Sequence, residues 1–84
     1  MSMHTEILKY HRIRDIRMDR DLTQAEIASL LHVSQNTYAQ YELGITRYPL
    51  DAVVTLAKYY NVSLDYLVGL TDEQTPYPRK RRKP

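Results

Sequence analysis

The sequence predicts an all-α domain of five helices. Apolar residues recur with helical spacing, most clearly in the fourth segment, where they occupy positions i, i+3, i+4 and i+7: Val53, Leu56, Ala57 and Tyr60. Residues that favour helix starts precede the segments, and no stretch shows the polar–apolar alternation of a half-buried strand. The 84 residues suffice for one small domain with a modest core, and the absence of cysteine excludes disulfides and thiolate metal sites.

The first helix is predicted from about Thr5 to Arg20. Three apolar residues at three-residue spacing line one of its faces: Tyr10, Ile13 and Ile16. The second helix lies in TQAEIASLLH, where Thr23 is a good N-cap and Glu26, three residues later, completes a capping box. Its inner stripe is expected to consist of Ile27, Ala28 and Leu31.

The remaining helices are bounded by equally clear signals. The third begins at Ser34, an N-cap candidate, and Gly44 supplies a left-handed stop. The fourth begins near Pro49, because proline suits a first helical turn. The fifth lies in SLDYLVG, where Ser63 caps the start and Gly69 ends the helix.

After Leu70 the chain becomes polar and rich in proline, so we expect a folded domain over residues 1–70 and a mobile tail over residues 71–84. The tail holds the run RKRRK, residues 79–83. Without those five charges, seven basic residues remain against ten acidic ones, a net charge of −3 instead of +2. Net charge alone is therefore weak evidence for a nucleic-acid partner.

The short connection between the second and third helices is informative. Only HVS separates them, and two helices joined by so few residues cross steeply, as in a helix-turn-helix. The second helix of such a pair lies on the outside of the domain and is supported from behind. We expect Tyr38 and Tyr41 to face that support. Four polar residues should then face outward: Gln35, Asn36, Thr37 and Gln40.

From Arg12 to Asp72 the chain resembles the phage-repressor and Cro-like helix-turn-helix proteins, the xenobiotic-response-element family. The matching stretches are RIRDIRMDRDLTQAEIASLL, VSQNTYAQYELG and LAKYYNVSLDYLVGLTD. The resemblance implies a compact lambda-repressor-like DNA-binding domain with its helix-turn-helix at the second and third helices. It also implies a sequence-specific transcriptional regulator, most readily a repressor, that binds DNA as a homodimer.

The chain departs from the family pattern at three positions. Asp21 and His32 stand where the family often has glycine in a left-handed backbone, a conformation that Asp and His tolerate better than most residues. Ile45 replaces a residue that is frequently basic. We therefore expect both turns to survive and the phosphate contact after the third helix to be weakened.

The polar start of the third helix suits base reading. Residues near the N-terminus of such a helix contact base edges in the major groove, and amide side chains offer both a donor and an acceptor. By resemblance, the base-reading positions are Gln35, Asn36, Thr37 and Gln40. The alternative is that these four side chains are simply solvated.

The resemblance also assigns supporting roles. Residues expected at phosphates are Thr23, Gln24, Ser34, Arg47 and Tyr48, because they lie at helix starts or in the loop after the third helix. A partly buried ion pair between Arg17 and Glu42 should fix the third helix against the first. An ordinary solvated role is the alternative for Gln24 and Arg47.

Other function classes find little support. The three histidines show no metal-ligand spacing, and the two glycines are both explained as helix stops, so we expect no enzyme activity, no cofactor and no metal. No apolar run approaches the ~18 residues that a membrane span requires, and no signal peptide is evident. These observations predict a cytoplasmic protein without a membrane partner. The alternative function is an antitoxin-type or other protein-interaction module, whose protein partner would be a toxin or another regulator.

Overall fold

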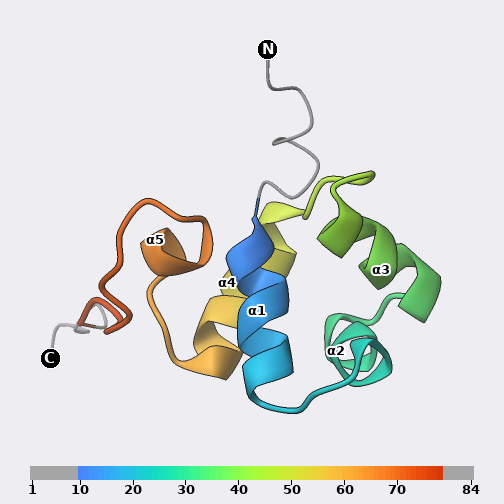
Figure 1. The fold of residues 1–84 in the computed structure, drawn as a ribbon, viewed down its shortest axis with the longest axis horizontal. Helices are drawn as coiled ribbons and strands as arrows, with labels where there is room; N and C mark the ends of the chain where they lie inside the picture. The colour runs from blue at the N-terminus through green and yellow to red at the C-terminus, as the bar shows by residue number, and fades with distance from the viewer. Residues whose placement is uncertain (1–9, 79–84) are drawn as a thin grey trace, which may run out of the picture.

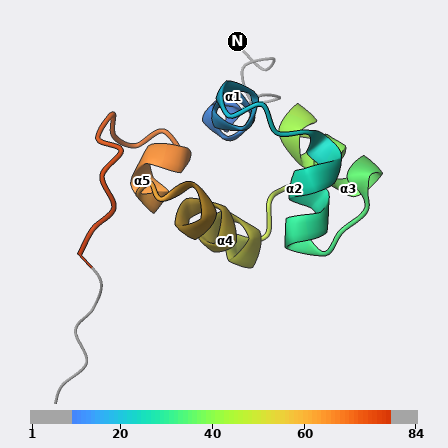
Figure 2. The same cartoon turned by 90° about the horizontal axis from the view of Figure 1, so that it is seen from below.

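The computed structural model describes residues 10–78, and within that range it contains five helices and no strand. In chain order they are α1 (His11–Asp19), α2 (Gln24–Leu31), α3 (Gln35–Leu43), α4 (Leu50–Tyr60) and α5 (Leu64–Leu67). Figure 1 shows α1 and α4 at the centre, with α5 on one side and the α2–α3 pair on the other, and Figure 2 shows the same order from below. The predicted all-α class is confirmed.

Three helices begin at the caps that the sequence predicts. Thr23 and Glu26 form a complete capping box: the Glu26 N–H donates to Thr23 Oγ1 (3.0 Å) and the Thr23 N–H donates to Glu26 Oε1 (2.7 Å). Ser34 and Ser63 each accept a hydrogen bond, at 3.0 Å, from the N–H group three residues later. These bonds satisfy backbone donors that have no partner inside the helix.

The first helix begins later than predicted. Tyr10 has φ −115° and ψ 50°, which lie outside the helical region, so α1 begins at His11 and not at Thr5. The apolar spacing that suggested a longer helix includes Tyr10. This residue directly precedes α1, and its side chain packs against the core. Residues 5–9 of the prediction lie outside the described part of the chain.

Left-handed residues close the helices and turns where the sequence indicates. Asp21 (φ 56°), His32 (φ 60°) and Gly44 (φ 79°) all adopt this conformation. Asn61 (φ 60°) ends α4 in the same way, although the sequence analysis did not single it out. Asn, Asp and His are the non-glycine residues that tolerate this backbone best, so the turns keep their geometry without glycine.

One hydrophobic core joins all five helices. Its largest completely buried side chains include at least one from each helix: Ile13, Ile27, Tyr38, Leu56, Tyr60 and Leu67. Burying a large apolar side chain contributes about 1.5–3 kcal/mol, so the short helices are held mainly by this shared interior.

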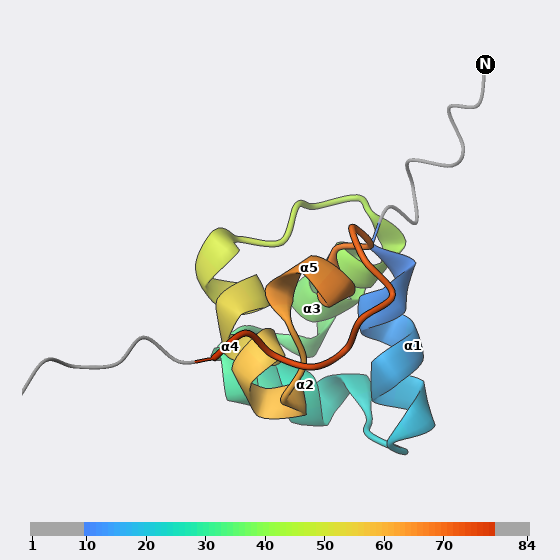
Figure 3. The same ribbon diagram turned by 90° about the vertical axis from the view of Figure 1, so that its left-hand side faces the viewer.

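The chain after α5 continues to make contacts with the folded domain. We call residues 71–77 the C-terminal strap. The buried Ser63 donates its N–H to the Gln74 carbonyl (2.9 Å) and its hydroxyl to the Glu73 carbonyl (3.2 Å), and the Tyr77 hydroxyl donates to Asp65. Figure 3 shows the strap turning beside α1 and then running back below α5 and in front of α4. Contacts with the domain thus extend beyond residue 70, where the sequence prediction places its end.

Arg12 connects the strap to α1. Its guanidinium donates to the carbonyl oxygens of Tyr66 (2.9 Å) and Thr71 (2.7 Å) and to Asp72 Oδ1 (3.0 Å). It also lies 4.2 Å from the centre of the Tyr66 ring. The sequence prediction missed this segment because its contacts are polar and carry no apolar periodicity. The basic residues at 79–83 lie outside the described range.

A buried ion pair holds α3 against α1. Arg17 Nε lies 2.7 Å from Glu42 Oε2, and Arg17 Nη2 donates to Glu42 Oε1 at 3.0 Å, which gives a bidentate pair. Arg17 Nη1 donates to the Leu22 carbonyl (2.8 Å), and Gln24 Nε2 donates to Glu42 Oε1 (3.0 Å). The side chains of Arg17 and Glu42 are only 12% and 2% exposed. The ion pair that the resemblance implied is present.

The surroundings of this pair keep both groups charged. Burial alone would raise the pKa of Glu42, but the hydrogen bonds from Arg17 and Gln24 outweigh it, so the pKa of Glu42 lies below its usual value. The hydrogen bond to Glu42 raises the pKa of Arg17. Because the folded-state pKa of Glu42 is lowered, its contribution to stability is present above the unfolded-state pKa and is lost as the pH falls.

The strap should contribute to the stability of the domain. A chain that ends at Leu70 should unfold with a free energy lower by about 1–3 kcal/mol, because the buried N–H of Ser63 loses the Gln74 carbonyl. Urea denaturation followed by circular dichroism measures this difference. A chain that ends at Pro78 retains every strap contact and should match the full-length protein. Equal stability of the two shortened chains would show that the strap does not support the fold.

The ion pair should make stability depend on pH in a defined direction. At pH 7, Glu42→Gln should lower the free energy of unfolding by about 3 kcal/mol, because the half-buried Arg17 charge loses its partner. The advantage of the wild-type protein should shrink below about pH 4.3, the pKa of an unperturbed Glu, as Glu42 becomes protonated. Denaturation of both proteins between pH 7 and pH 2.5 measures this advantage. A difference that stays constant over the whole range would contradict this assignment.

Candidate nucleic-acid interface

Helix α3 has two faces of opposite character. Tyr38, Tyr41 and Glu42 are buried against the rest of the domain, at 0%, 7% and 6% exposure. Gln35 and Asn36 are exposed on the other face. Thr37 and Gln40 are half-buried at its edge. The burial of Tyr38 and Tyr41 agrees with the predicted orientation of the helix, and α3 lies at the end of the molecule that Figure 2 shows on the right.

The hydroxyl groups at the start of α3 form hydrogen bonds within the helix start itself. Ser34 Oγ accepts from the Thr37 N–H (3.0 Å) and donates to Thr37 Oγ1 (2.9 Å). Thr37 Oγ1 is then the acceptor of that bond, so the hydroxyl hydrogen of Thr37 is left to donate elsewhere. Ser34 was predicted to contact phosphate, but its hydroxyl is already occupied as the helix cap. Its side chain remains exposed.

The end of α3 brings a loop residue beside the outer face. The N–H groups of Ile45 and Thr46 donate to the Gln40 carbonyl at 3.0 and 3.2 Å. Thr46 Oγ1 donates to the side-chain oxygen of Gln40 at 3.1 Å. No sequence pattern predicted a role for Thr46. The signal that could have found it is Gly44, whose left-handed backbone turns the chain back towards the last turn of α3.

Residues at the start of α2 make more contacts within the domain than predicted. Gln24, expected at a phosphate, donates to Glu42 Oε1 (3.0 Å) and belongs to the hydrogen-bond network of the ion pair. The second amide hydrogen of Gln24 can still donate to a ligand. Thr23 is exposed and caps the helix through its hydroxyl, which also donates to Glu26 Oε1 at 3.2 Å.

Tyr48 is half-buried and packs against the core. Its ring centre is 5.2 Å from that of Tyr41, 6.4 Å from that of Tyr38 and 6.2 Å from that of Tyr10, so these four residues form a tyrosine cluster. Its hydroxyl oxygen is buried, and burial raises the pKa of Tyr48 above its usual value. The expected contact of Tyr48 with phosphate therefore does not fit the structure. Its neighbour Arg47 is exposed, as that role requires.

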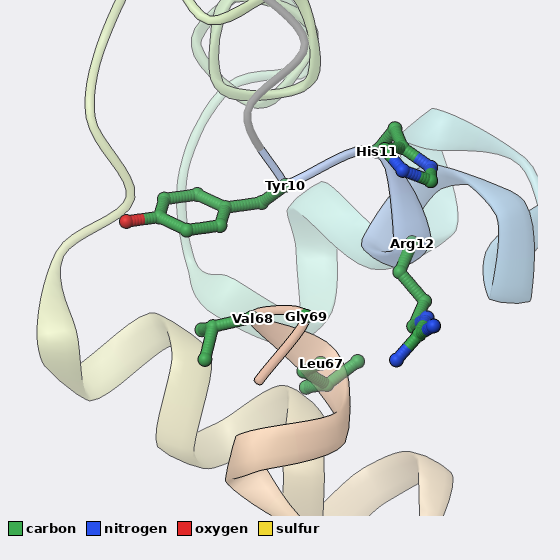
Figure 4. Close-up of a pocket in the computed structure, with 6 residues that line it drawn as sticks. All are labelled: Tyr10, His11, Arg12, Leu67, Val68 and Gly69. Atoms are coloured by element: carbon green, nitrogen blue, oxygen red, sulfur yellow. The ribbon is translucent and has the colours of Figure 1, made fainter. Parts of the chain in front are cut away.

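A small pocket lies elsewhere on the molecule, between the start of α1 and the end of α5. It has a volume of about 120 Å³ and is lined by Tyr10, His11, Arg12, Leu67, Val68 and Gly69 (Figure 4). The guanidinium of Arg12 is already held by carbonyl oxygens and Asp72. The pocket therefore offers little charge to a ligand, and the outer face of α3 is the stronger candidate site.

Among residues 10–78, no group of three or more His, Cys, Asp or Glu side chains is arranged to hold a metal ion. Within the same range, no helix combines the length and apolar character that a membrane crossing requires.

Comparison with known proteins identifies relatives over most of the chain. The chain is 39% identical over 72 residues to the HTH-type transcriptional regulator YobD of Bacillus subtilis, which covers 86% of this chain and 62% of that protein. It is 42% identical over 69 residues to the cryptic phage CTXphi transcriptional repressor RstR of Vibrio cholerae, which covers 82% of this chain and 60% of the repressor. The chain thus spans less than two thirds of the length of these relatives.

A solved structure shares the fold. The crystal structure of a transcriptional regulator from Listeria innocua superposes with a TM-score of 0.68 at 27% identity, over 89% of this chain and 64% of that one. The family description "Helix-turn-helix" matches residues 13–67, which include α2, α3 and the turn between them. In agreement with its resemblance to the phage-repressor and Cro-like proteins, the chain belongs to the helix-turn-helix family.

Proposed function

We propose that this chain is a sequence-specific DNA-binding transcriptional regulator that inserts α3 into the major groove. The observation that carries this proposal is the outer face of α3, where four side chains able to form hydrogen bonds lie together: Gln35, Asn36, Thr37 and Gln40. A face that reads bases needs side chains that donate and accept hydrogen bonds, and a helix of short length needs firm support from behind.

Helix α3 is held in place from behind and at both ends. Tyr38 and Tyr41 anchor α3 in the core, Glu42 joins it to α1 and α2, and caps close both of its ends. A fixed helix keeps its side chains in one orientation, which specific hydrogen bonds to base edges require. Phosphate contacts would come from the N–H groups at the starts of α2 and α3, from Gln24 and from Arg47.

A single reading helix covers only a few base pairs. Useful specificity then requires two half-sites about one helical turn apart, which a two-fold symmetric homodimer provides. We infer that the protein binds DNA as such a dimer and represses transcription by occupying its site. The relatives YobD and RstR, a transcriptional regulator and a transcriptional repressor by name, support this role.

The first test selects bound duplexes from a random DNA pool. The expected result is enrichment of a motif with two related half-sites, with centres about 10 base pairs or a multiple of that apart. Sequencing after successive rounds at about 150 mM salt measures the enrichment, because low salt exaggerates non-specific binding. Enrichment of no sequence over the starting pool would overturn the proposed sequence-specific function.

The second test separates reading from support. Gln35→Ala should leave the melting temperature nearly unchanged because Gln35 is exposed, and it should lose discrimination worth about 1–3 kcal/mol at one base pair per half-site. Arg17→Ala should instead lower stability first, because it leaves Glu42 buried without its partner. Melting curves and titrations of single-base operator variants measure both effects. The reverse outcome would mean that the two faces of α3 have been assigned the wrong way round.

A further inference from the structure

We propose that Glu26 weakens the binding of this protein to every DNA duplex, because it holds a negative charge beside the phosphate that the start of α2 would contact. This inference rests on the proposed function, since it takes the start of α2 to face the DNA backbone. It assigns to Glu26 the control of affinity, whereas sequence preference stays with the outer face of α3.

The carboxylate of Glu26 lies at the very start of α2. Its Oε1 atom accepts hydrogen bonds from the Thr23 N–H (2.7 Å) and from the Thr23 hydroxyl (3.2 Å). Glu26 and Thr23 are both exposed, so the charge faces solvent. The same helix start is held beside α3, because Gln24 donates to Glu42 (3.0 Å). The negative charge is therefore fixed at the end of α2 that flanks the proposed reading helix.

The capping box leaves few donors for a phosphate at this helix start. The N–H groups of Thr23 and Glu26 both donate within the box. The N–H groups of Gln24 and Ala25 have no partner inside the helix, so they are the ones that could meet a phosphate. From the dimensions of a helical turn, a phosphate oxygen bound to them would lie roughly 5–7 Å from the Glu26 carboxylate. The two negative charges would then be close neighbours.

Repulsion at this separation is large enough to measure. Depending on how much water the interface retains, it corresponds to about a 3- to 10-fold loss of affinity. No excess of positive charge in the described part of the chain masks it, since residues 10–78 hold six Lys and Arg against nine Asp and Glu, a net charge of −3. Phosphates occur in every duplex and carry no sequence information directly, so operator and random DNA should be affected alike.

The experiment compares three variants of the full chain. Glu26→Gln removes the charge, and the variant should remain folded because glutamine can replace glutamate in a capping box. Glu26→Asp keeps a charge in the first turn of α2. Glu73→Gln is the matched control: Glu73 is exposed, its carboxylate also accepts from a backbone N–H, that of Thr75 (3.2 Å), and it belongs to the strap, which Figure 1 shows on the α5 side, away from α3.

Each protein is titrated with the selected operator and with a random duplex of the same length, at about 50 and 200 mM salt. At the lower salt, Glu26→Gln should bind both duplexes about 3- to 10-fold more tightly than the wild type. This gain should shrink at the higher salt, because ions screen the repulsion. Glu26→Asp and Glu73→Gln should bind like the wild type.

Three results would overturn the proposal: no gain in Glu26→Gln, equal gains in Glu26→Gln and Glu73→Gln, or a gain confined to the operator. Equal gains would mean that only the net charge of the protein matters. A gain confined to the operator would mean that Glu26 affects a base contact. A wild-type protein that prefers no sequence would instead contradict the proposed function, and the titrations with the random duplex would still test the role of Glu26.

Discussion

The buried pair of Arg17 and Glu42 is the interaction on which the arrangement of this domain depends. It joins α1 to α3 directly, reaches α2 through Gln24, and fixes the turn between α1 and α2 through the Leu22 carbonyl. Each acceptor oxygen of the carboxylate is occupied, which offsets the cost of burying the charge. A hydrophobic contact in the same place would hold the helices together but would not define their relative rotation so narrowly.

Residues that cap α3 also contact residues on its outer face. Ser34 closes the start of the helix and orders Thr37, and the turn at Gly44 brings Thr46 to Gln40. A helix of nine residues with a polar start is a weak structure by itself. Its stability comes from tertiary packing and caps, so its outer side chains are free to be chosen for hydrogen bonding and not for helix propensity.

Local signals were predicted well, whereas contacts across space were predicted only where the family resemblance implied them, as for Arg17 and Glu42. The capping box at Thr23 depends on neighbouring residues, so the sequence revealed it, and the family resemblance indicated the left-handed turns at Asp21 and His32. Tyr48 looked like an exposed loop residue, because only the folded chain brings it to the other tyrosines of the cluster. The strap and the contact of Thr46 were not predicted either, because isolated polar contacts leave no periodic pattern in the sequence.

The strap also determines where the described chain leaves the domain. It runs past α5 to Pro78, on the side of the molecule opposite to α3 in Figure 1. An affinity handle or a fluorescent label joined beyond that point would therefore emerge from the α5 side. A surface that captured the protein through such a handle would leave α3 directed towards the solution, where a duplex could approach it without obstruction.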